Sequence, residues 1–339
     1  PPPLAPPPAS PTGAGGPTKR GRPRARQVRR VILALLVAWL AFLVIVPFLA
    51  WGKVTKTEWE PSGQRPAASD GENYLLVGSD SRADLSAEER RTLTTGNPEG
   101  QRTDTIMLLH TGSGPNLLMS IPRDSLVDIP GRGESKINAA FAFGGAPLLV
   151  QTLEQSTGIH LDGYVEIGLG GVVDMVDAVG GVEICPNKRM RDPLAGLDVQ
   201  KGCQGADGTT ALAYARSRKT NLKLGDVARA RQQREVVKGV GRKALSPMTV
   251  LNPFRYYGLN MAVPAAFSFG EGMGKVSAGR FALALSRVNG GNGLTCGVPI
   301  RDLAVNWDEE RSQSLFAKII ADDTESVGKD LCNPSGLPQ

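Results

Sequence analysis

The sequence predicts a mixed α/β fold, with a mixed sheet flanked by helices, preceded by one transmembrane helix. Two patterns support this prediction. Short apolar runs typical of buried strands alternate with amphipathic helical segments over residues 73–332, and no internal repeat is present. A run of 21 residues without a charge, Val31–Trp51, precedes them. Since 41% of the 339 residues are hydrophobic, the chain can bury the core of one large domain.

The first thirty residues form a segment of distinct composition. Residues 1–18 are mostly Pro, Gly, Ala and Ser, and residues 1–30 carry seven Lys or Arg and no acid. This composition predicts a disordered, basic arm. The whole chain has a net charge of +6, so the other 309 residues sum to −1. A nearly neutral body argues against a nucleic-acid partner.

The apolar run Val31–Trp51 is long enough to cross the hydrocarbon core of a bilayer. The alternative is a cleaved signal peptide, which would need a shorter apolar core and a cleavage site of small residues. Neither is evident after Phe48. We therefore expect an uncleaved single span in the cell membrane. The positive charges before it predict a cytoplasmic N-terminus and an extracytoplasmic remainder.

The cysteines agree with export, because disulfides persist in oxidising compartments. Their spacings include no CxxC pair of the zinc-binding kind. Among the three possible connectivities we expect sequential pairing, Cys185 with Cys203 and Cys296 with Cys332. Only two histidines are present, which excludes a histidine-rich metal site and argues against a Ser-His-Asp triad. His110 ends an apolar strand and is expected to be structural.

Residues 52–72 are rich in Pro and Gly and are expected to be a linker, and residues 333–339 a tail. The domain between them, residues 73–332, is expected to be extracytoplasmic. It opens with a buried strand at Tyr74–Val77, followed by the polar loop Gly78–Arg82 and a polar insertion over residues 83–101.

A hairpin pattern comes next. Thr105–Thr111 and Leu117–Ile121 are apolar runs separated by the turn GSGPN. An antiparallel pair places the start of its first strand and the end of its second at one rim. The residues expected at that rim are Arg102, Asp104, Arg123 and Asp124. Asp80 joins them if the Tyr74 strand runs parallel to the second arm.

The remaining elements follow in order. They are a helix from Lys136, another opened by Pro147, a strand at Tyr164–Ile167, a helix at Gly170–Val179, a strand at Val182–Ile184, helices over residues 207–240, a mixed region to residue 293, and a helix at Glu309–Ala321.

One helix combines a basic residue with an apolar face. Read from the cap Asp226, it has one stripe made of Arg229, Gln233, Val236, Val237 and Val240. The other side is expected to carry Arg231, Arg234, Glu235 and Lys238. An arginine beside valines needs a partner, and Arg216 and Arg218 lie upstream. Clustered arginines suit a phosphate group, although Arg216 and Arg218 alone are also typical of a solvated helix end.

Seven motifs in this order closely resemble the LytR-CpsA-Psr family of membrane-anchored enzymes of Gram-positive cell envelopes. They are GSDSR, RTDTIMLL, SIPRDSLVDIPG, KINAAFAFGG, VDAVGGVEI, ALAYARSR and DVARARQQ, within residues 73–240. The resemblance implies an α/β/α fold. It also implies transfer of a glycopolymer from a polyprenyl-pyrophosphate carrier to peptidoglycan, with a phosphodiester formed at a muramic acid 6-hydroxyl.

The resemblance also implies site residues. Those expected to bind the pyrophosphate are Arg123, Lys136, Arg216, Arg218, Arg229 and Gln233, with Arg102 completing the rim. Asp80 and Asp104 would coordinate Mg²⁺, a hard cation that prefers carboxylate oxygens. Asp104, Arg102 and Arg123 are the candidate catalytic residues, with Asp104 a hypothetical base. The chain is thus expected to be a Mg²⁺-dependent phosphotransferase.

Other interpretations remain open. The same residues would serve a hydrolase that uses water as acceptor, or a non-catalytic module that binds polyprenyl phosphate and signals. Asp80 is also typical of a turn, Asp124 of an ion pair with Arg123, and Lys136 of a helix start. For the prenyl chain the sequence offers apolar candidates such as Phe141, Phe143 and Leu148, without a pattern that selects among them.

Overall fold

A computed structural model describes residues 22–79, 103–217, 225–244, 246–288 and 293–338, apart from the side chains of residues 22–25, 104, 225–230, 263 and 265. The chain divides into two compact units, residues 1–48 and residues 49–339. Each unit is described by itself below.

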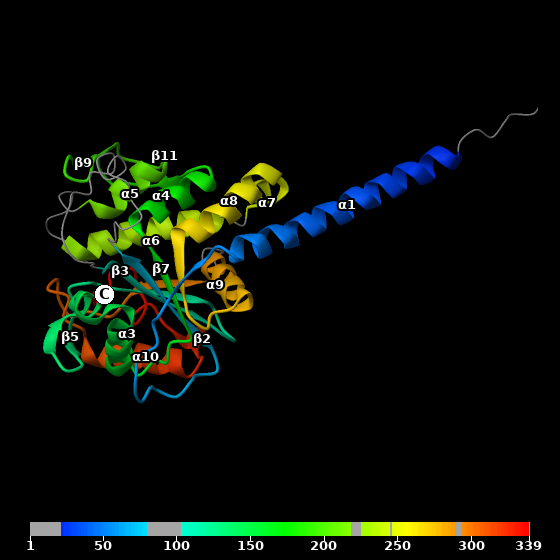
Figure 1. The fold of residues 1–339 in the computed structure, drawn as a ribbon. Helices are drawn as coiled ribbons and strands as arrows, with labels where there is room; N and C mark the ends of the chain where they lie inside the picture. The colour runs from blue at the N-terminus through cyan, green and yellow to red at the C-terminus, as the bar shows by residue number, and fades with distance from the viewer. Residues whose placement is uncertain (1–21, 80–102, 218–224, 245, 289–292, 339) are drawn as a thin grey trace, which may run out of the picture. The chain divides into compact units, whose positions relative to one another are not determined.

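The first unit contains most of helix α1, Arg22–Trp51 (Figure 1). Residues Arg26–Trp51 are long and apolar enough to cross a membrane, so the predicted apolar helix is confirmed. Pro47 lies inside the helix without ending it. The helix begins earlier than predicted, within the segment expected to be a flexible arm.

The second unit is built on a mixed seven-stranded sheet, which confirms the predicted fold class. The strand order is β1-β12-β7-β2-β3-β4-β13. Three neighbouring pairs are parallel, β1 with β12, β2 with β7 and β4 with β13, and the other three are antiparallel. The strands are β1 (Thr55–Thr57), β2 (Glu72–Ser79), β3 (Thr103–Thr111), β4 (Leu117–Ile121), β7 (Gly163–Ile167), β12 (Phe267–Gly270) and β13 (Leu294–Gly297).

Helices cover both faces of this sheet (Figure 1). Alternate residues of a strand point to opposite faces. Leu75 and Val77 of β2 pack in a core with α3 (Ile137–Thr157) and α10 (Glu309–Ile320). Tyr74 and Leu76 pack in another core with α9 (Lys275–Arg287) and with Val237 of α6 (Gly225–Ala244). Helix α3 has a kink with non-helical angles at Gly144 and Gly145, so a second helical segment starts near Pro147, as predicted.

A further hydrophobic cluster forms beside the α6 face of the sheet. It joins α6 to α4 (Leu169–Ala178), α5 (Gly208–Arg216) and two small two-stranded sheets. Their strands are β8 (Val182–Ile184) with β11 (Gln204–Ala206), and β9 (Met190–Asp192) with β10 (Leu197–Val199). The predicted strand at Val182–Ile184 therefore exists, but it pairs with β11 rather than with the main sheet. A last hairpin, β5 (Leu126–Ile129) with β6 (Gly133–Lys136), precedes α3.

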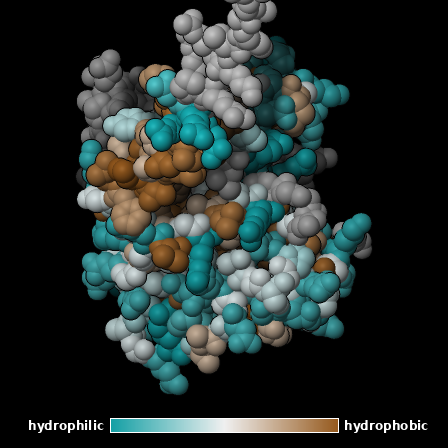
Figure 2. Space-filling view, turned by 90° about the vertical axis from the view of Figure 1, so that its right-hand side faces the viewer, coloured by the Kyte–Doolittle hydropathy of each residue, from teal (hydrophilic) through white to brown (hydrophobic). Residues whose placement is uncertain are grey.

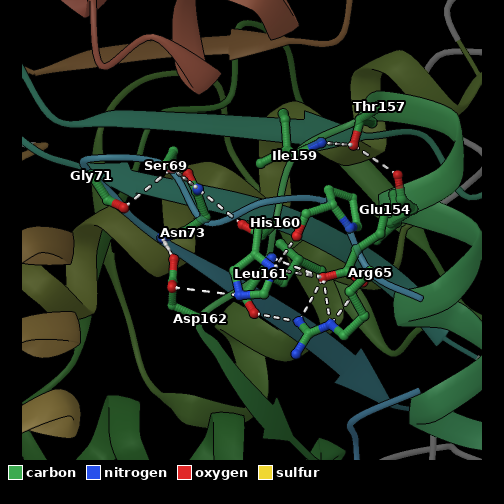
Figure 3. A network of polar contacts seen from close by, with 12 residues as sticks. Arg65, Ser69, Gly71, Asn73, Glu154, Thr157, Ile159, His160, Leu161 and Asp162 are labelled. Atoms are coloured by element: carbon green, nitrogen blue, oxygen red, sulfur yellow. Dashed lines mark hydrogen bonds and ion pairs between the residues drawn. The ribbon is translucent and has the colours of Figure 1, made fainter. Parts of the chain in front are cut away.

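Residues 52–72, expected to be a linker, are instead packed on the domain. Strand β1 lies in the main sheet and Trp59 is buried. Figure 3 shows Arg65 bound to Glu154 of α3, with an Nη2 to Oε1 distance of 2.6 Å, and donating to the Leu161 carbonyl oxygen. The hydrogen bond to Glu154 raises the pKa of Arg65. This segment, although rich in Pro and Gly, is therefore an extended chain packed on the domain and not a free spacer.

The C-terminal residues are also part of the domain and not a tail. The Gly297 amide donates to the Asn333 carbonyl oxygen, and the Ile300 amide donates to that of Gly336. Before this segment lies a short 3₁₀ turn, η1 (Thr324–Ser326). The end of the chain therefore supplies hydrogen-bond partners for backbone amides at the end of β13 and just after it.

The mixed region after residue 240 contains two helices before β12 and one after it. Those before it are α7 (Pro247–Leu251) and α8 (Pro253–Ala266). Gly171 of α4 lies so close to the Ala266 backbone that a Cβ there would collide with it, which explains the glycine at this α4–α8 contact. Figure 2 shows one face of the molecule, on which hydrophobic side chains gather in one area and hydrophilic side chains cover most of the rest.

The predicted disulfides are both present, Cys185–Cys203 and Cys296–Cys332, and no described cysteine is free. His110 is fully buried, and its ring nitrogens lie 2.8 Å from Asn73 Oδ1 and 3.1 Å from Asp322 Oδ1. Burial lowers the pKa of His110. This arrangement confirms a structural role for the histidine.

Candidate functional site

A cavity of about 900 Å³, its open mouth included, separates the main sheet from the α4–α5 side of the domain. Its walls come from β2, β3, β7, α4, α5, α6, α9 and the first residue of β12. Most of the lining side chains are apolar, among them Leu76, Ile167, Val172, Met175, Leu212 and Phe267. Walls of this apolar character suit an apolar ligand.

Helix α6 contributes the face that the sequence predicted. Gln233, Val236, Val237 and Val240 all line the cavity. The stripe therefore faces an open space and not a closed core. Arg229 lies on α6 one helical turn before Gln233, while its side chain lies outside the described residues.

Four lining residues carry polar side chains, Ser79, Thr105, Arg216 and Gln233, and we call them the polar edge. Ser79 ends β2 and Thr105 lies near the start of β3. Arg216 is the last residue of α5, where a cation also interacts favourably with the helix dipole. Arg216 and Gln233 are thus brought to one cavity from helices separated in the chain by residues 217–224.

The backbone next to the polar edge is irregular. Gly78 pairs with Thr105 and Ser79 pairs with Thr103, so Asp104 is the extra residue of a β-bulge. The Thr103 hydroxyl lies 3.1 Å from the Gly78 carbonyl oxygen and 2.9 Å from that of Thr105. A Cβ at Gly78 would lie 2.7 Å from the Thr105 Cβ, so a glycine is needed here. Bulges re-aim side chains and are frequent beside active sites.

The predicted rim is formed in part. Strand β3 is antiparallel to both β2 and β4, so β2 runs in the same direction as β4, as the prediction required. The end of β2, the start of β3 and the end of β4 therefore lie at one edge of the sheet. Because Ile106 pairs with Ile121, positions 104 and 123 lie two residues further along at that edge. Asp80 and Arg102 lie outside the described residues, and of Asp104 only the backbone is described.

Arg123, Asp124 and Lys136 form a cluster of their own. Lys136 Nζ lies 2.9 Å from Asp124 Oδ1, and Arg123 Nε lies 3.7 Å from Asp124 Oδ2. The backbone between residues 123 and 138 is held together by the Asn138 amide, which donates to the Arg123 carbonyl oxygen. None of the three residues lines the cavity. The ion pair foreseen as the alternative role of Asp124 is therefore present.

Glu235, expected on the outer side of α6, ties that helix to its neighbours. Its Oε1 accepts from the Cys185 amide at 2.5 Å and its Oε2 accepts from the Tyr214 hydroxyl at 2.9 Å. Burial, and then the Glu235 carboxylate, raise the pKa of Tyr214. The disulfide loop, α5 and α6 are thus joined through one carboxylate, and this fixes Arg216 relative to Gln233.

The prediction for Arg234 is wrong, because this side chain is buried and not on the outer side. Its Nη1 donates to Ser120 Oγ of β4 at 2.6 Å, and its Nη2 donates to the Pro334 carbonyl oxygen. Burial, and then the nearby Arg231, lower the pKa of Arg234 to about 10. Arg231 is exposed, as predicted. The C-terminal segment supplies the second partner of Arg234, which helical periodicity alone cannot reveal.

Comparison with known proteins decides the family. The family model described as LytR_cpsA_psr matches residues 51–263. The chain belongs to the LytR-CpsA-Psr family. The chain is 44% identical over 297 residues to a protein of Corynebacterium glutamicum named probable cell wall biosynthesis protein LcpB, with 85% of this chain and 70% of that protein covered.

A second relative is named polyisoprenyl-teichoic acid–peptidoglycan teichoic acid transferase TagU, from Enterococcus faecalis. It is 36% identical over 185 residues, which cover 53% of this chain and 56% of that protein. The chain thus spans little more than half the length of TagU. Relatives of this LytR-CpsA-Psr chain are therefore named as cell wall biosynthesis proteins and as transferases.

Two solved structures share the fold of this chain. The LytR-Csp2A-Psr enzyme from Actinomyces oris has a TM-score of 0.64 at 20% identity, covering 79% of this chain and 96% of that one. A structure described as TagT bound to LI-WTA has a TM-score of 0.56 at 20% identity, covering 79% of this chain and 100% of that one.

Some site features could not be found from the sequence. The cavity itself is one, since its walls come from elements spread between residues 76 and 285. None of the apolar candidates for a prenyl site lines it. Phe141 and Leu148 belong to the core on the α3 face of the sheet, and Phe143 is half exposed against Arg132. The roles of Arg102, Arg123, Lys136, Arg218 and Arg229 stay predictions.

Proposed function

We propose that this LytR-CpsA-Psr chain transfers a glycopolymer from a polyprenyl-pyrophosphate carrier to peptidoglycan, with formation of a phosphodiester. The observation that carries the proposal is the cavity with apolar walls and the polar edge of Ser79, Thr105, Arg216 and Gln233. A polyprenyl pyrophosphate likewise has an apolar part and a polar part, since its long prenyl chain is apolar and its pyrophosphate head is anionic. The names of two similar proteins support it, a teichoic acid transferase to peptidoglycan and TagT bound to LI-WTA.

The apolar walls and the polar edge would bind different parts of the lipid-linked donor. The apolar walls favour the prenyl chain, because each methylene removed from water contributes about 0.8 kcal/mol. The Arg216 guanidinium offers several N–H donors to phosphate oxygens, and the Gln233 amide adds a neutral donor. We propose that Arg229, one turn earlier on α6, and Arg218, just after α5, complete this clamp.

The site residues fit a divalent cation by their chemistry. The β-bulge puts Asp104 beside the end of β2, and Asp80 is the residue that follows Ser79 in the chain. Two carboxylates suit Mg²⁺, which prefers oxygen ligands. We propose that Asp80 and Asp104 would hold Mg²⁺, which supplies neutralisation of phosphate charge when bound.

The transfer itself needs positioning and charge neutralisation above all. The acceptor hydroxyl oxygen forms the new bond to the phosphorus nearest the polymer, the bond between that phosphorus and the bridging oxygen breaks, and polyprenyl phosphate leaves. The hydroxyl proton must pass to a base, for which Asp104 is the candidate. Arg102 and Arg123, from the same edge of the sheet, are proposed to stabilise the developing negative charge.

The proposed location follows from helix α1. We propose that it is an uncleaved anchor with the N-terminus in the cytoplasm, since the charges of residues 1–30 are all positive. Protease added outside intact cells should then digest residues after Gly52 and spare the N-terminal arm. Complete protection of the domain would contradict this orientation.

The test of the function uses the full chain in detergent or vesicles with purified lipid-linked polymer and peptidoglycan. We expect polymer covalently attached to peptidoglycan, with loss of most activity in Arg216→Ala and Gln233→Ala. Arg231→Ala is the matched control, because this arginine is exposed on the same helix as Gln233. It should keep normal activity. Release of free polymer into water would favour the hydrolase, and binding without turnover would favour the signalling module.

A further inference from the structure

The α7–α8 hairpin, residues 247–266, exposes large apolar side chains on one side. Met248 and Leu251 of α7 are 65% and 68% exposed, and Phe254 and Tyr257 of α8 are 86% and 52% exposed. We call these four residues the hairpin patch. Other large exposed apolar residues of the domain, such as Leu194 and Leu303, are single. Isolated cases are normal on protein surfaces, whereas a group within ten residues indicates a binding surface.

The opposite side of the hairpin is packed. Thr249 of α7 is buried, and its hydroxyl donates to the Lys243 carbonyl oxygen at 2.7 Å. Leu259 of α8 packs against the cluster that joins α4, α5 and α6. The hairpin is therefore fixed on the domain by one side, and the patch is its free side.

The charged residues of the hairpin and of the segments just before and after it in the chain have a single sign. The segment Val236–Gly270 contains no Asp or Glu and four basic residues, Lys238, Arg242, Lys243 and Arg255. Arg242 and Arg255 are exposed. Apolar side chains next to basic ones are typical of an element that lies in the interface of an anionic bilayer. A tyrosine at the edge of such a patch suits the headgroup region.

The connectivity places the hairpin near the point where the chain enters the domain from the proposed anchor. Strand β1 starts at Thr55 and is parallel to β12, which directly follows α8. The rings of Trp51 and Phe269 lie 5.2 Å apart, and Lys56 Nζ lies 4.5 Å from the Trp51 ring centroid. At 1.5 Å per residue, Phe254 is about 18 Å along α8 from β12. The end of α8 therefore lies beside residues 51–57, by which the chain enters the domain.

We propose that the hairpin patch inserts into the outer surface of the bilayer that holds this chain's own anchor, with anionic lipid headgroups against its basic residues. This rests on the proposed anchor. The consequence concerns the cavity, because α8 packs on α4 and leads into Phe267, and both α4 and Phe267 line it. A prenyl chain could then pass from the bilayer to the apolar walls with little exposure to water.

The test uses the full chain in nanodiscs. All four natural cysteines are in disulfides, so one added cysteine carries a fluorescent label. Labels in Phe254→Cys and Met248→Cys should be quenched strongly by nitroxide lipids and shielded from aqueous iodide. Leu194→Cys and Leu303→Cys are matched controls, because Leu194 and Leu303 are also apolar and more than half exposed, and they should behave in the opposite way. Because the replaced residues are exposed, all four variants should fold, and unchanged circular dichroism verifies it.

Lipid quenching at position 254 no greater than at position 194 would overturn the proposal. So would a label shielded from iodide but not reached by nitroxide lipid, because its cover would then be protein, such as a second copy. Equal quenching in anionic and neutral discs would overturn the part assigned to basic residues. Flotation with lipid verifies that the anchor is inserted in the bilayer. Because the depth of the label does not depend on turnover, a failure of the patch to insert is distinguishable from a failure of the transfer activity.

Discussion

Filling the apolar part of the cavity should remove the extra affinity for long prenyl chains and leave the affinity for short ones unchanged. Val240→Trp is the suitable change, because Val240 lines the cavity and lies seven residues after Gln233 on α6. At 1.5 Å per residue this is about 10 Å from the polar edge. An indole at this depth blocks the path of a long chain and leaves the space next to Arg216 unchanged.

The size of the effect follows from burial. Each methylene group that leaves water contributes about 0.8 kcal/mol, roughly fourfold in affinity. For the unaltered chain, affinity should therefore rise steeply from geranyl pyrophosphate to longer prenyl pyrophosphates until the cavity is filled. In Val240→Trp the rise should stop at a short chain. Competition against a fluorescent prenyl pyrophosphate, measured with the full chain in detergent, gives both series.

A matched control is Val276→Trp, since Val276 is an exposed valine on α9 that does not line the cavity. It should reproduce the unaltered series. The reasoning would be refuted if Val240→Trp kept full affinity for undecaprenyl pyrophosphate while its circular dichroism stayed native. A parallel loss for short and long chains would also count against it, because the polar edge would then have been disturbed.

Three further predictions concern stability, each measured by denaturant unfolding. Arg234→Met should cost about 2–4 kcal/mol, because Ser120 Oγ and the Pro334 carbonyl oxygen lose their donor, whereas exposed Arg231→Met should change stability by less than about 0.5 kcal/mol. Burial lowers the pKa of His110 from 6.5, so the free energy of unfolding should decrease as the pH falls below 6.5. His110→Gln should reduce this pH dependence, and an unchanged pH dependence would contradict the role given to His110. Replacing both Cys296 and Cys332 by serine opens a loop with a sequence separation of 36 and should cost about 4 kcal/mol, and a loss near zero would contradict the estimate.

The elements that the sequence predicts well are those whose pattern is local. Strand β2 and the β3–β4 hairpin follow from short apolar runs around a polar turn. The antiparallel rule then gives the shared edge of positions 104 and 123. The valine stripe of α6 follows from helical periodicity, which also gives the correct side for Gln233.

What the sequence could not predict depends on distant segments. Periodicity places Arg234 with the outer residues of α6, yet the C-terminal segment and β4 cover it and satisfy its donors. In the same way, residues 52–72 have the composition of a linker, but their path is fixed by partners such as Glu154, far along the chain. The cavity walls come from eight separate helices and strands, so no single stretch of sequence predicts the cavity.

The most direct test of the proposed function is a crystal structure of this chain with undecaprenyl pyrophosphate. We predict density for the prenyl chain along Val236, Val240 and Phe267, and phosphate oxygens within hydrogen-bond distance of the Arg216 guanidinium and the Gln233 amide. Density for the pyrophosphate on another surface, or a prenyl chain on the α3 face of the sheet, would contradict the account.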